Sequence, residues 1–195
     1  MKNRRALLDA AKSLVAAKGV KATTIAQIAA RAGVAKGLLF YYFKDKKSVV
    51  QAIAEELDAE YMAALRPALE RPTALERLHA LIGHHFDFLE HAPESAQFLY
   101  QSAGAAHGAG RGADRDDGVV GVGGFYEHLY GRILDILTQG VAAGEFDAAD
   151  LEELAYMLLG SLHGVGRLKL FEFKREYDAA KHLAAFYDKI LLRRK

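Results

Sequence analysis

A short segment, residues 23–34, combines the residue types that a helix-turn-helix requires. Its sequence is Thr-Thr-Ile-Ala-Gln-Ile-Ala-Ala-Arg-Ala-Gly-Val. Two short helices joined by a tight turn need a small residue where they cross, which is Ala29, and a glycine in the turn, which is Gly33. Such a pair projects its second helix outward, and the major groove of DNA is wide enough to receive a helix. We therefore expect DNA binding, with a buried pair of helices in an unrelated protein as the alternative.

The charge of the chain is concentrated in the same region. Residues 1–47 hold eleven Lys and Arg against two Asp, a net charge of +9. The whole chain carries +1, so the remainder carries −8. A basic head on an acidic body is typical of a protein that meets a polyanion at one end, although a solvated basic surface would look the same.

The elements that must position this motif are predicted to be helices throughout. Helix-favouring residues are abundant, there are only three prolines, and no long stretch alternates with period two. Capping boxes at Thr24–Gln27 and Thr73–Glu76 mark two helix starts, and Gly19 marks a helix end. Helices are expected at about residues 4–18, 25–31, 35–42, from Asp45 to about 65, 74–90, 93–103, 125–143, 149–171 and 178–193. Eight glycines in residues 104–124 predict a flexible surface loop.

The segment that follows the turn, residues 33–47, reads Gly-Val-Ala-Lys-Gly-Leu-Leu-Phe-Tyr-Tyr-Phe-Lys-Asp-Lys-Lys. It resembles the recognition helix and the start of the fourth helix in the TetR family of transcriptional repressors. The close similarity covers about residues 4–55. The resemblance implies an all-α fold of about nine helices, with a three-helix DNA-binding domain at residues 1–47 and an effector-binding and dimerisation domain at residues 48–195.

The resemblance also assigns DNA contacts by position. Thr24 and Lys46 would contact phosphate, and Lys36 and Gly37 would meet base edges. The other assigned residues lie on the same short helix: Leu38, Phe40, Tyr41 and Tyr42. Lysines and helix N-terminal amides favour phosphate oxygens, which agrees with these assignments. Leu39 and Phe43 are expected in the core.

Two positions depart from the family pattern. Ala35 stands where a capping Ser or Thr is usual, so one cap hydrogen bond should be missing. Phe40 stands where a tyrosine hydroxyl usually contacts phosphate, so that contact should be absent or replaced by an apolar contact with a base methyl group.

The body is expected to hold a pocket for a small hydrophobic or aromatic effector. An apolar wall with a few polar tips suits such a ligand, although stripes of this kind also form ordinary helix cores. The candidate lining residues are Tyr61, His85, Phe88, Tyr100, Phe125, His128, Met157 and His163.

The last two helices are expected to form a homodimer. Gly160 and Gly164 would allow close helix approach, and an apolar stripe on the last helix comprises Leu183, Phe186, Tyr187 and Ile190. A groove within one chain is the alternative.

The sequence thus predicts a ligand-responsive regulator, a repressor that binds a pseudo-palindromic operator as a homodimer. An architectural DNA-binding protein without an effector is the alternative. No enzymatic activity, metal or cofactor is expected, because the chain has no cysteine, no Ser-His-Asp ordering, no His-Glu-x-x-His and no glycine-rich phosphate loop. No signal core and no membrane-length apolar run is found, so a cytoplasmic protein is expected.

Overall fold

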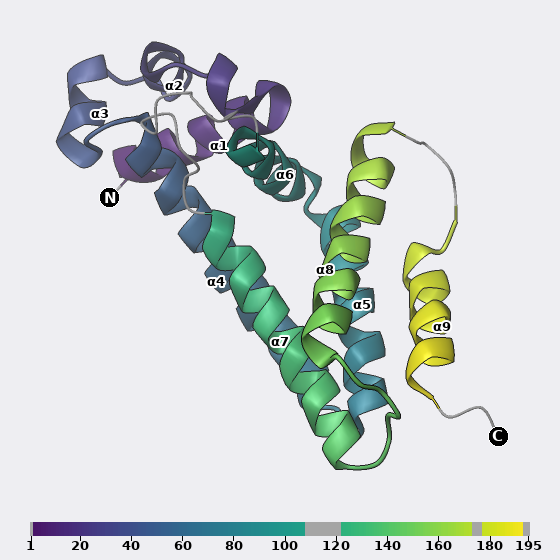
Figure 1. Ribbon diagram of the computed structural model, residues 1–195. Helices are drawn as coiled ribbons and strands as arrows, with labels where there is room; N and C mark the ends of the chain where they lie inside the picture. The colour runs from purple at the N-terminus through teal and green to yellow at the C-terminus, as the bar shows by residue number, and fades with distance from the viewer. Residues whose placement is uncertain (1, 108–121, 173–176, 193–195) are drawn as a thin grey trace. The chain divides into compact units, whose positions relative to one another are not determined.

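The protein is built from helices, as the sequence predicts. The computed structural model describes residues 2–107, 122–172 and 177–192, and within those ranges it contains nine α-helices, one π-helix and no strand (Figure 1). The α-helices are α1 Lys2–Ala22, α2 Ile25–Arg31, α3 Lys36–Tyr42, α4 Lys46–Leu69, α5 Ala74–His91, α6 Pro93–His107, α7 Val122–Ala142, α8 Leu151–Arg167 and α9 Ala179–Leu191. None of the described helices is long and apolar enough to cross a membrane.

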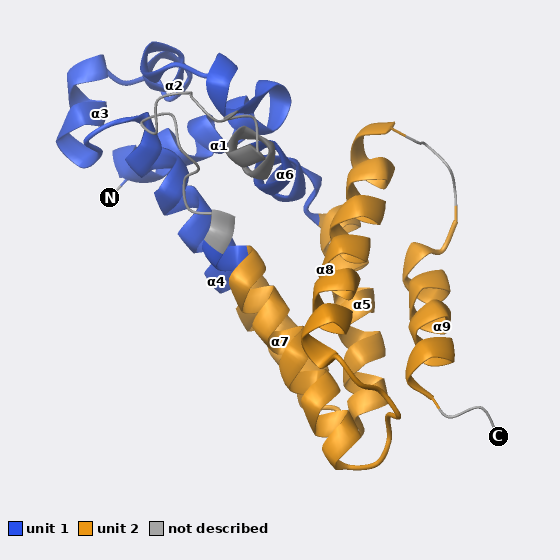
Figure 2. Ribbon diagram, viewed as in Figure 1, with its two compact units in different colours: residues 1–60, 92–125 blue, residues 61–91, 126–195 orange. Residues whose placement is uncertain are grey.

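The chain divides into two compact units (Figure 2). Unit 1 comprises residues 1–60 and 92–125, and unit 2 comprises residues 61–91 and 126–195. The division does not follow the predicted boundary after residue 47, for two reasons. Helix α4 continues without a break through residue 47, and α6 packs along α1 within unit 1. The functional boundary at residue 47 stays a prediction.

Helix α1 supplies the centre of unit 1. Its buried residues include Leu7, Ala11 and Val15, which lie on one face at helical spacing. Gly19 has a φ of 80°, which confirms the predicted break of the helix at a residue that tolerates positive φ. The chain then makes a short further turn to Ala22, and the buried Thr23 hydroxyl donates to the Gly19 carbonyl at 2.9 Å.

Helix α6 is longer than predicted. It extends to His107 rather than fading near residue 103, and α7 begins at Val122. The predicted glycine-rich loop is therefore wrong for residues 104–107 and 122–124, and its remaining part, residues 108–121, lies outside the described residues.

In unit 2 the start of α5 is held by the segment that links α7 to α8. The Glu145 carboxylate accepts from the amides of Ala74 and Leu75, both at 3.1 Å. The next amide, that of Glu76, donates to the Thr73 hydroxyl at 3.1 Å, which confirms the predicted capping box. The first three amides of α5 are thus all hydrogen-bonded.

The same corner of unit 2 contains a glycine that its packing requires. A Cβ on Gly140 would stand 2.2 Å from the Phe146 ring and 2.9 Å from the Ala74 Cβ. The amide of Asp147 donates to the carbonyl of Leu191 at 2.8 Å, so the α7–α8 link also holds the end of α9. Helix α8 ends earlier than predicted and continues as a π-helix, Leu168–Glu172.

Candidate DNA-binding interface

The first helix of the motif, α2, has a complete capping box. The amide of Gln27 donates to the Thr24 hydroxyl at 3.3 Å, and the Gln27 side chain accepts from the Thr24 amide at 3.0 Å. Lys18 also donates to the Gln27 side chain, at 2.8 Å. These contacts confirm the predicted start of α2 and fix its orientation against the end of α1.

The turn between α2 and α3 is tight because Gly33 adopts a φ of 66°. A Cβ at this residue would meet no atom within 4 Å, so the backbone conformation rather than lack of space favours glycine. The Val34 amide donates to the Ala29 carbonyl at 3.0 Å. Ile28 and Ala29 are buried, so the two helices meet where the small residue was predicted.

Helix α3 presents one face to solvent and one to the core. Leu39 and Phe43 are buried, which confirms their predicted packing role. Phe40 is 51% and Tyr41 is 79% exposed, and Lys36 and Gly37 are exposed beside them. Leu38 and Tyr42 are half-buried, and the Tyr41 and Tyr42 rings meet edge to face at 5.0 Å. The exposed Thr24 lies at the start of α2.

The exposed face of α3 can make both polar and apolar contacts. The Lys36 ammonium lies 6.0 Å from the centre of the Phe40 ring, within the range of a cation–π contact. Ala35 makes no side-chain cap hydrogen bond, as expected from its departure from the family pattern. The first turn of α3 therefore keeps amides that no capping side chain occupies.

Lys46 has a role that the sequence did not indicate. Its ammonium donates to the carbonyls of Val20 and Thr23, at 2.9 and 3.0 Å, and so ties the start of α4 to the last turn of α1 and the residue that follows it. Two of its three donors are thereby used within the chain. Its predicted phosphate contact remains a prediction, whereas Lys44 and Lys47 beside it are exposed.

The start of α4 carries a further capping box that the sequence reasoning missed. The Ser48 amide donates to the Asp45 carboxylate at 2.7 Å, and the Asp45 amide donates to the Ser48 hydroxyl at 3.2 Å. The hydrogen bond from the Ser48 amide is the largest cause that lowers the pKa of Asp45, and the Ser48 side chain, Lys44 and Lys47 lower it further, against a smaller opposing effect of desolvation. Asp followed three residues later by Ser, just before the apolar run of α4, is the signal that could have shown it.

The residues predicted to line an effector pocket fall into three groups. Tyr100 and Phe125 are buried in unit 1. His128 and Met157 lie in unit 2 but are exposed, Met157 to 56%. The other four, all in unit 2, are brought together.

These four form a cluster of aromatic rings and imidazoles. The Tyr61 hydroxyl lies 3.2 Å from His85 Nδ1, and the Tyr61 ring meets the Phe88 ring edge to face at 5.2 Å. Burial, followed by the nearby imidazoles of His163 and His84, lowers the pKa of His85 to about 3. His163 accepts or donates a 2.8 Å hydrogen bond with the Tyr126 hydroxyl. With its pKa lowered by burial, the His85 imidazole is uncharged at pH 7.

The predicted dimer residues divide in a similar way. Phe186 and Ile190 are exposed, Gly160 is exposed, and Gly164 and Leu183 are half-buried. Tyr187 is buried within unit 2, with its hydroxyl 3.2 Å from that of Ser161, so its ring is used for packing inside the chain. The structure thus leaves five of the six residues at least partly accessible.

Comparison with known proteins agrees with this geometry. The family model for bacterial regulatory proteins, tetR family, matches residues 7–53. The transcriptional regulator BetI of Klebsiella pneumoniae is 38% identical over 87 residues, which cover 43% of this chain and 45% of BetI. BetI of an Escherichia coli strain is 37% identical over the same shares of both chains. The aligned part spans less than half the length of these curated relatives.

Solved structures extend the likeness to nearly the whole chain, at the level of the fold. The FadR regulator from Bacillus halodurans has a TM-score of 0.77 and 20% identity, covering 95% of this chain and 93% of that one. FadR from Bacillus subtilis has a TM-score of 0.75 and 21% identity, covering 93% and 96%.

The fold and the outward-facing α3 define an all-helical protein of the helix-turn-helix class. Residues 7–53 carry the family signature itself. In this region the chain matches the TetR family of bacterial transcription regulators.

Proposed function

We propose that the protein is a ligand-responsive transcriptional repressor that binds a pseudo-palindromic operator as a homodimer. The observation that carries the proposal is the exposed face of α3, where Lys36, Phe40 and Tyr41 project from a helix anchored by the buried Leu39. A lysine can donate to guanine acceptors, and an aromatic ring can contact a thymine methyl group. Such a protein acts where the chromosome is, in the cytoplasm.

Pairing through α8 and α9 is supported by what these helices leave uncovered. A Cβ on Gly160 or Gly164 would meet no atom within 4 Å, so packing inside the chain does not require these glycines. Met157, Phe186 and Ile190 are large apolar side chains that remain exposed on the same two helices. A second copy would cover them, and two copies would hold two α3 helices about one DNA turn apart.

The dimer is tested by a pair of glycine variants. Gly164→Leu should separate the helices and give monomers in light scattering, whereas Gly131→Leu on α7 should leave the dimer intact. An intact dimer for Gly164→Leu would place the interface elsewhere.

The effector is proposed to be a small hydrophobic or aromatic molecule that releases the DNA. The support is the cluster around Tyr61 and His85, which offers aromatic rings and an imidazole that burial keeps uncharged at pH 7. FadR from Bacillus subtilis was solved in complex with stearoyl-CoA, so a chain of this fold can hold a ligand with a long apolar part.

One experiment separates a sensor from an architectural DNA-binding protein. An operator is selected from random duplexes with the full chain, and a library of apolar and aromatic compounds is screened by thermal shift. A compound that stabilises the protein should weaken operator binding, and the operator should weaken compound binding by the same factor. Stabilising compounds with equal affinity in the presence and absence of operator would contradict the proposal and favour the architectural function.

A further inference from the structure

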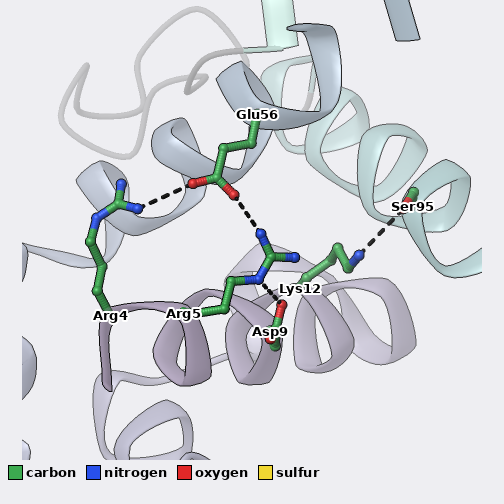
Figure 3. A network of polar contacts seen from close by, with 6 residues as sticks. All are labelled: Arg4, Arg5, Asp9, Lys12, Glu56 and Ser95. Atoms are coloured by element: carbon green, nitrogen blue, oxygen red, sulfur yellow. Dashed lines mark hydrogen bonds and ion pairs between the residues drawn. The ribbon is translucent and has the colours of Figure 1, made fainter. Parts of the chain in front are cut away.

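Two arginines in the first turn of α1 share one carboxylate from α4 (Figure 3). Arg4 Nη1 lies 3.2 Å from Glu56 Oε1, and Arg5 Nη1 lies 3.2 Å from Glu56 Oε2. Arg5 also pairs with Asp9 through its Nε, at 2.9 Å. Each oxygen of Glu56 thus holds a different arginine, and the group of two arginines and two acids carries no net charge.

This group lies beside the end of α3, the helix that is proposed to meet DNA. The Arg4 guanidinium carbon is 5.5 Å from the centre of the buried Phe43 ring, and Phe43 directly follows Tyr42, the last residue of α3. The strongly exposed Tyr41 lies two residues earlier on that helix. All these residues belong to unit 1, so their arrangement does not depend on unit 2.

The pairs are open to competition. The side chains of Arg4 and Glu56 are 46% and 35% exposed, and that of Arg5 is 57% exposed. Guanidinium groups bind carboxylate and phosphate through the same forked donors, so a phosphate can replace Glu56 at either arginine. Exposed ion pairs shift an equilibrium by only about two- to fivefold, which is small enough for a polyanion to reverse.

We infer that Glu56 competes with DNA phosphate for Arg4 and Arg5, and that it thereby lowers the affinity of the protein for DNA of any sequence. Phosphate contacts carry no sequence information, whereas contacts from α3 to base edges do. By restraining two arginines in a head of charge +9, Glu56 therefore lowers operator affinity and non-specific affinity alike. The inference rests on the proposed DNA binding and makes Glu56 a residue that limits the overall affinity for DNA without itself touching DNA.

The chain offers a matched control on the same helix. Glu56→Gln and Glu55→Gln each remove one negative charge from neighbouring positions of α4. Glu55 is exposed and accepts a hydrogen bond from Gln51 at 2.9 Å. Any effect of Glu56→Gln beyond that of Glu55→Gln therefore measures the contact with the arginines rather than the net charge.

The test uses the full chain and a random-sequence duplex, with binding measured by fluorescence anisotropy between 50 and 300 mM NaCl. Glu56→Gln should bind about two- to fivefold more tightly than Glu55→Gln at low salt. Its plot of log affinity against log salt should steepen by about 0.9 for each arginine that gains a phosphate. Affinity for the selected operator should rise by a similar factor, because the added contacts are to phosphates, which every duplex presents.

Repeating the two substitutions in a background that lacks both arginines tests whether the effect of Glu56 acts through them. A variant that carries both Arg4→Gln and Arg5→Gln and keeps its melting temperature serves as this background. In it, Glu56→Gln should raise the affinity for the random-sequence duplex no more than Glu55→Gln does. Equal affinities of the two single variants would overturn the inference. Weaker binding by Glu56→Gln would also overturn it, because Glu56 would then hold the arginines in place for DNA. Absence of salt-dependent DNA binding by the unaltered protein would refute the proposed function itself.

Discussion

The two compact units use aromatic and polar side chains in opposite ways. On α3 in unit 1, Phe40 and Tyr41 are exposed and Lys36 stands beside them. In unit 2, Tyr61 and His85 are buried and hydrogen-bonded to each other. Changes in the first set should therefore alter binding without altering stability, whereas changes in the second should alter stability even when no ligand is present.

The largest expected effect is the dependence of unit 2 on pH through His85. Burial lowers the pKa of its imidazole to about 3 in the folded protein, whereas an unfolded histidine takes up a proton near pH 6.5. Between these values the unfolded chain binds more protons, so the free energy of unfolding falls as the pH falls, by up to about 1.4 kcal/mol per pH unit. The loss begins below pH 6.5 and is complete near pH 3.

Urea unfolding at pH 7, 6 and 5 measures this dependence. His85→Gln should have a lower free energy of unfolding at pH 7 but a flatter pH profile, whereas His128→Gln, at an exposed position of α7, should keep the profile of the unaltered protein. A profile that His85→Gln leaves unchanged would mean that other groups cause the acid sensitivity.

The packing of unit 2 predicts opposite outcomes for two glycines of α7. Gly140→Ala would place a methyl group against the Phe146 ring, and this overpacking should cost about 1–3 kcal/mol of stability. Gly131→Ala meets no atom within 4 Å and should stabilise the helix by about 0.5–1 kcal/mol. Thermal or urea unfolding measures both, and a stabilised Gly140→Ala would show that Phe146 moves aside without cost.

The exposed face of α3 predicts a binding defect without a stability defect. Lys36→Ala should weaken binding to the selected operator by about 1–3 kcal/mol if the lysine reads a base. Random DNA should be affected much less, and the melting temperature should not change. Lys44→Ala, an exposed control of equal charge, should affect both duplexes alike. Equal losses on both duplexes for Lys36→Ala would end its base-reading role.

Lys46 gives the smallest effect and the closest test of the comparison, because it lies in unit 1 but is used inside the chain. Loss of its hydrogen bonds to the carbonyls of Val20 and Thr23 should lower stability by about 1 kcal/mol in Lys46→Ala. Lys47→Ala, at an exposed neighbour, should leave stability unchanged. Lower affinity of Lys46→Ala for all DNA at an unchanged melting temperature would instead support the phosphate contact that the sequence suggested.

The sequence predicted what depends on neighbouring residues. The capping boxes at Thr24 and Thr73, the break at Gly19 and the core positions of Leu39 and Phe43 follow from local spacing, and the structure confirms them. Helix content and the fold class followed from the same signals.

What the sequence could not predict depends on residues far apart in the chain. Glu56 contacts arginines about fifty positions earlier, and α6 packs along α1 across about eighty positions. The family resemblance assigns a phosphate contact to Lys46. Its hydrogen bond to Val20 could not be predicted, because the two residues meet only when α4 folds against α1. Helical periodicity describes one helix at a time, so it cannot separate Tyr61 and His85, which meet in the structure, from the exposed Met157.

The cap that Glu145 forms on α5 has a consequence for hydrogen exchange. Amides in the first turn of a helix ordinarily exchange fast, because no helical carbonyl accepts from them. Here the amides of Ala74 and Leu75 are held by a carboxylate about seventy residues further along the chain. They should exchange slowly, at a rate set by the departure of the α7–α8 link rather than by fraying of α5. Two amides at a helix end would thus report the opening of a distant segment, and Glu145→Gln should accelerate both while leaving the middle of α5 protected.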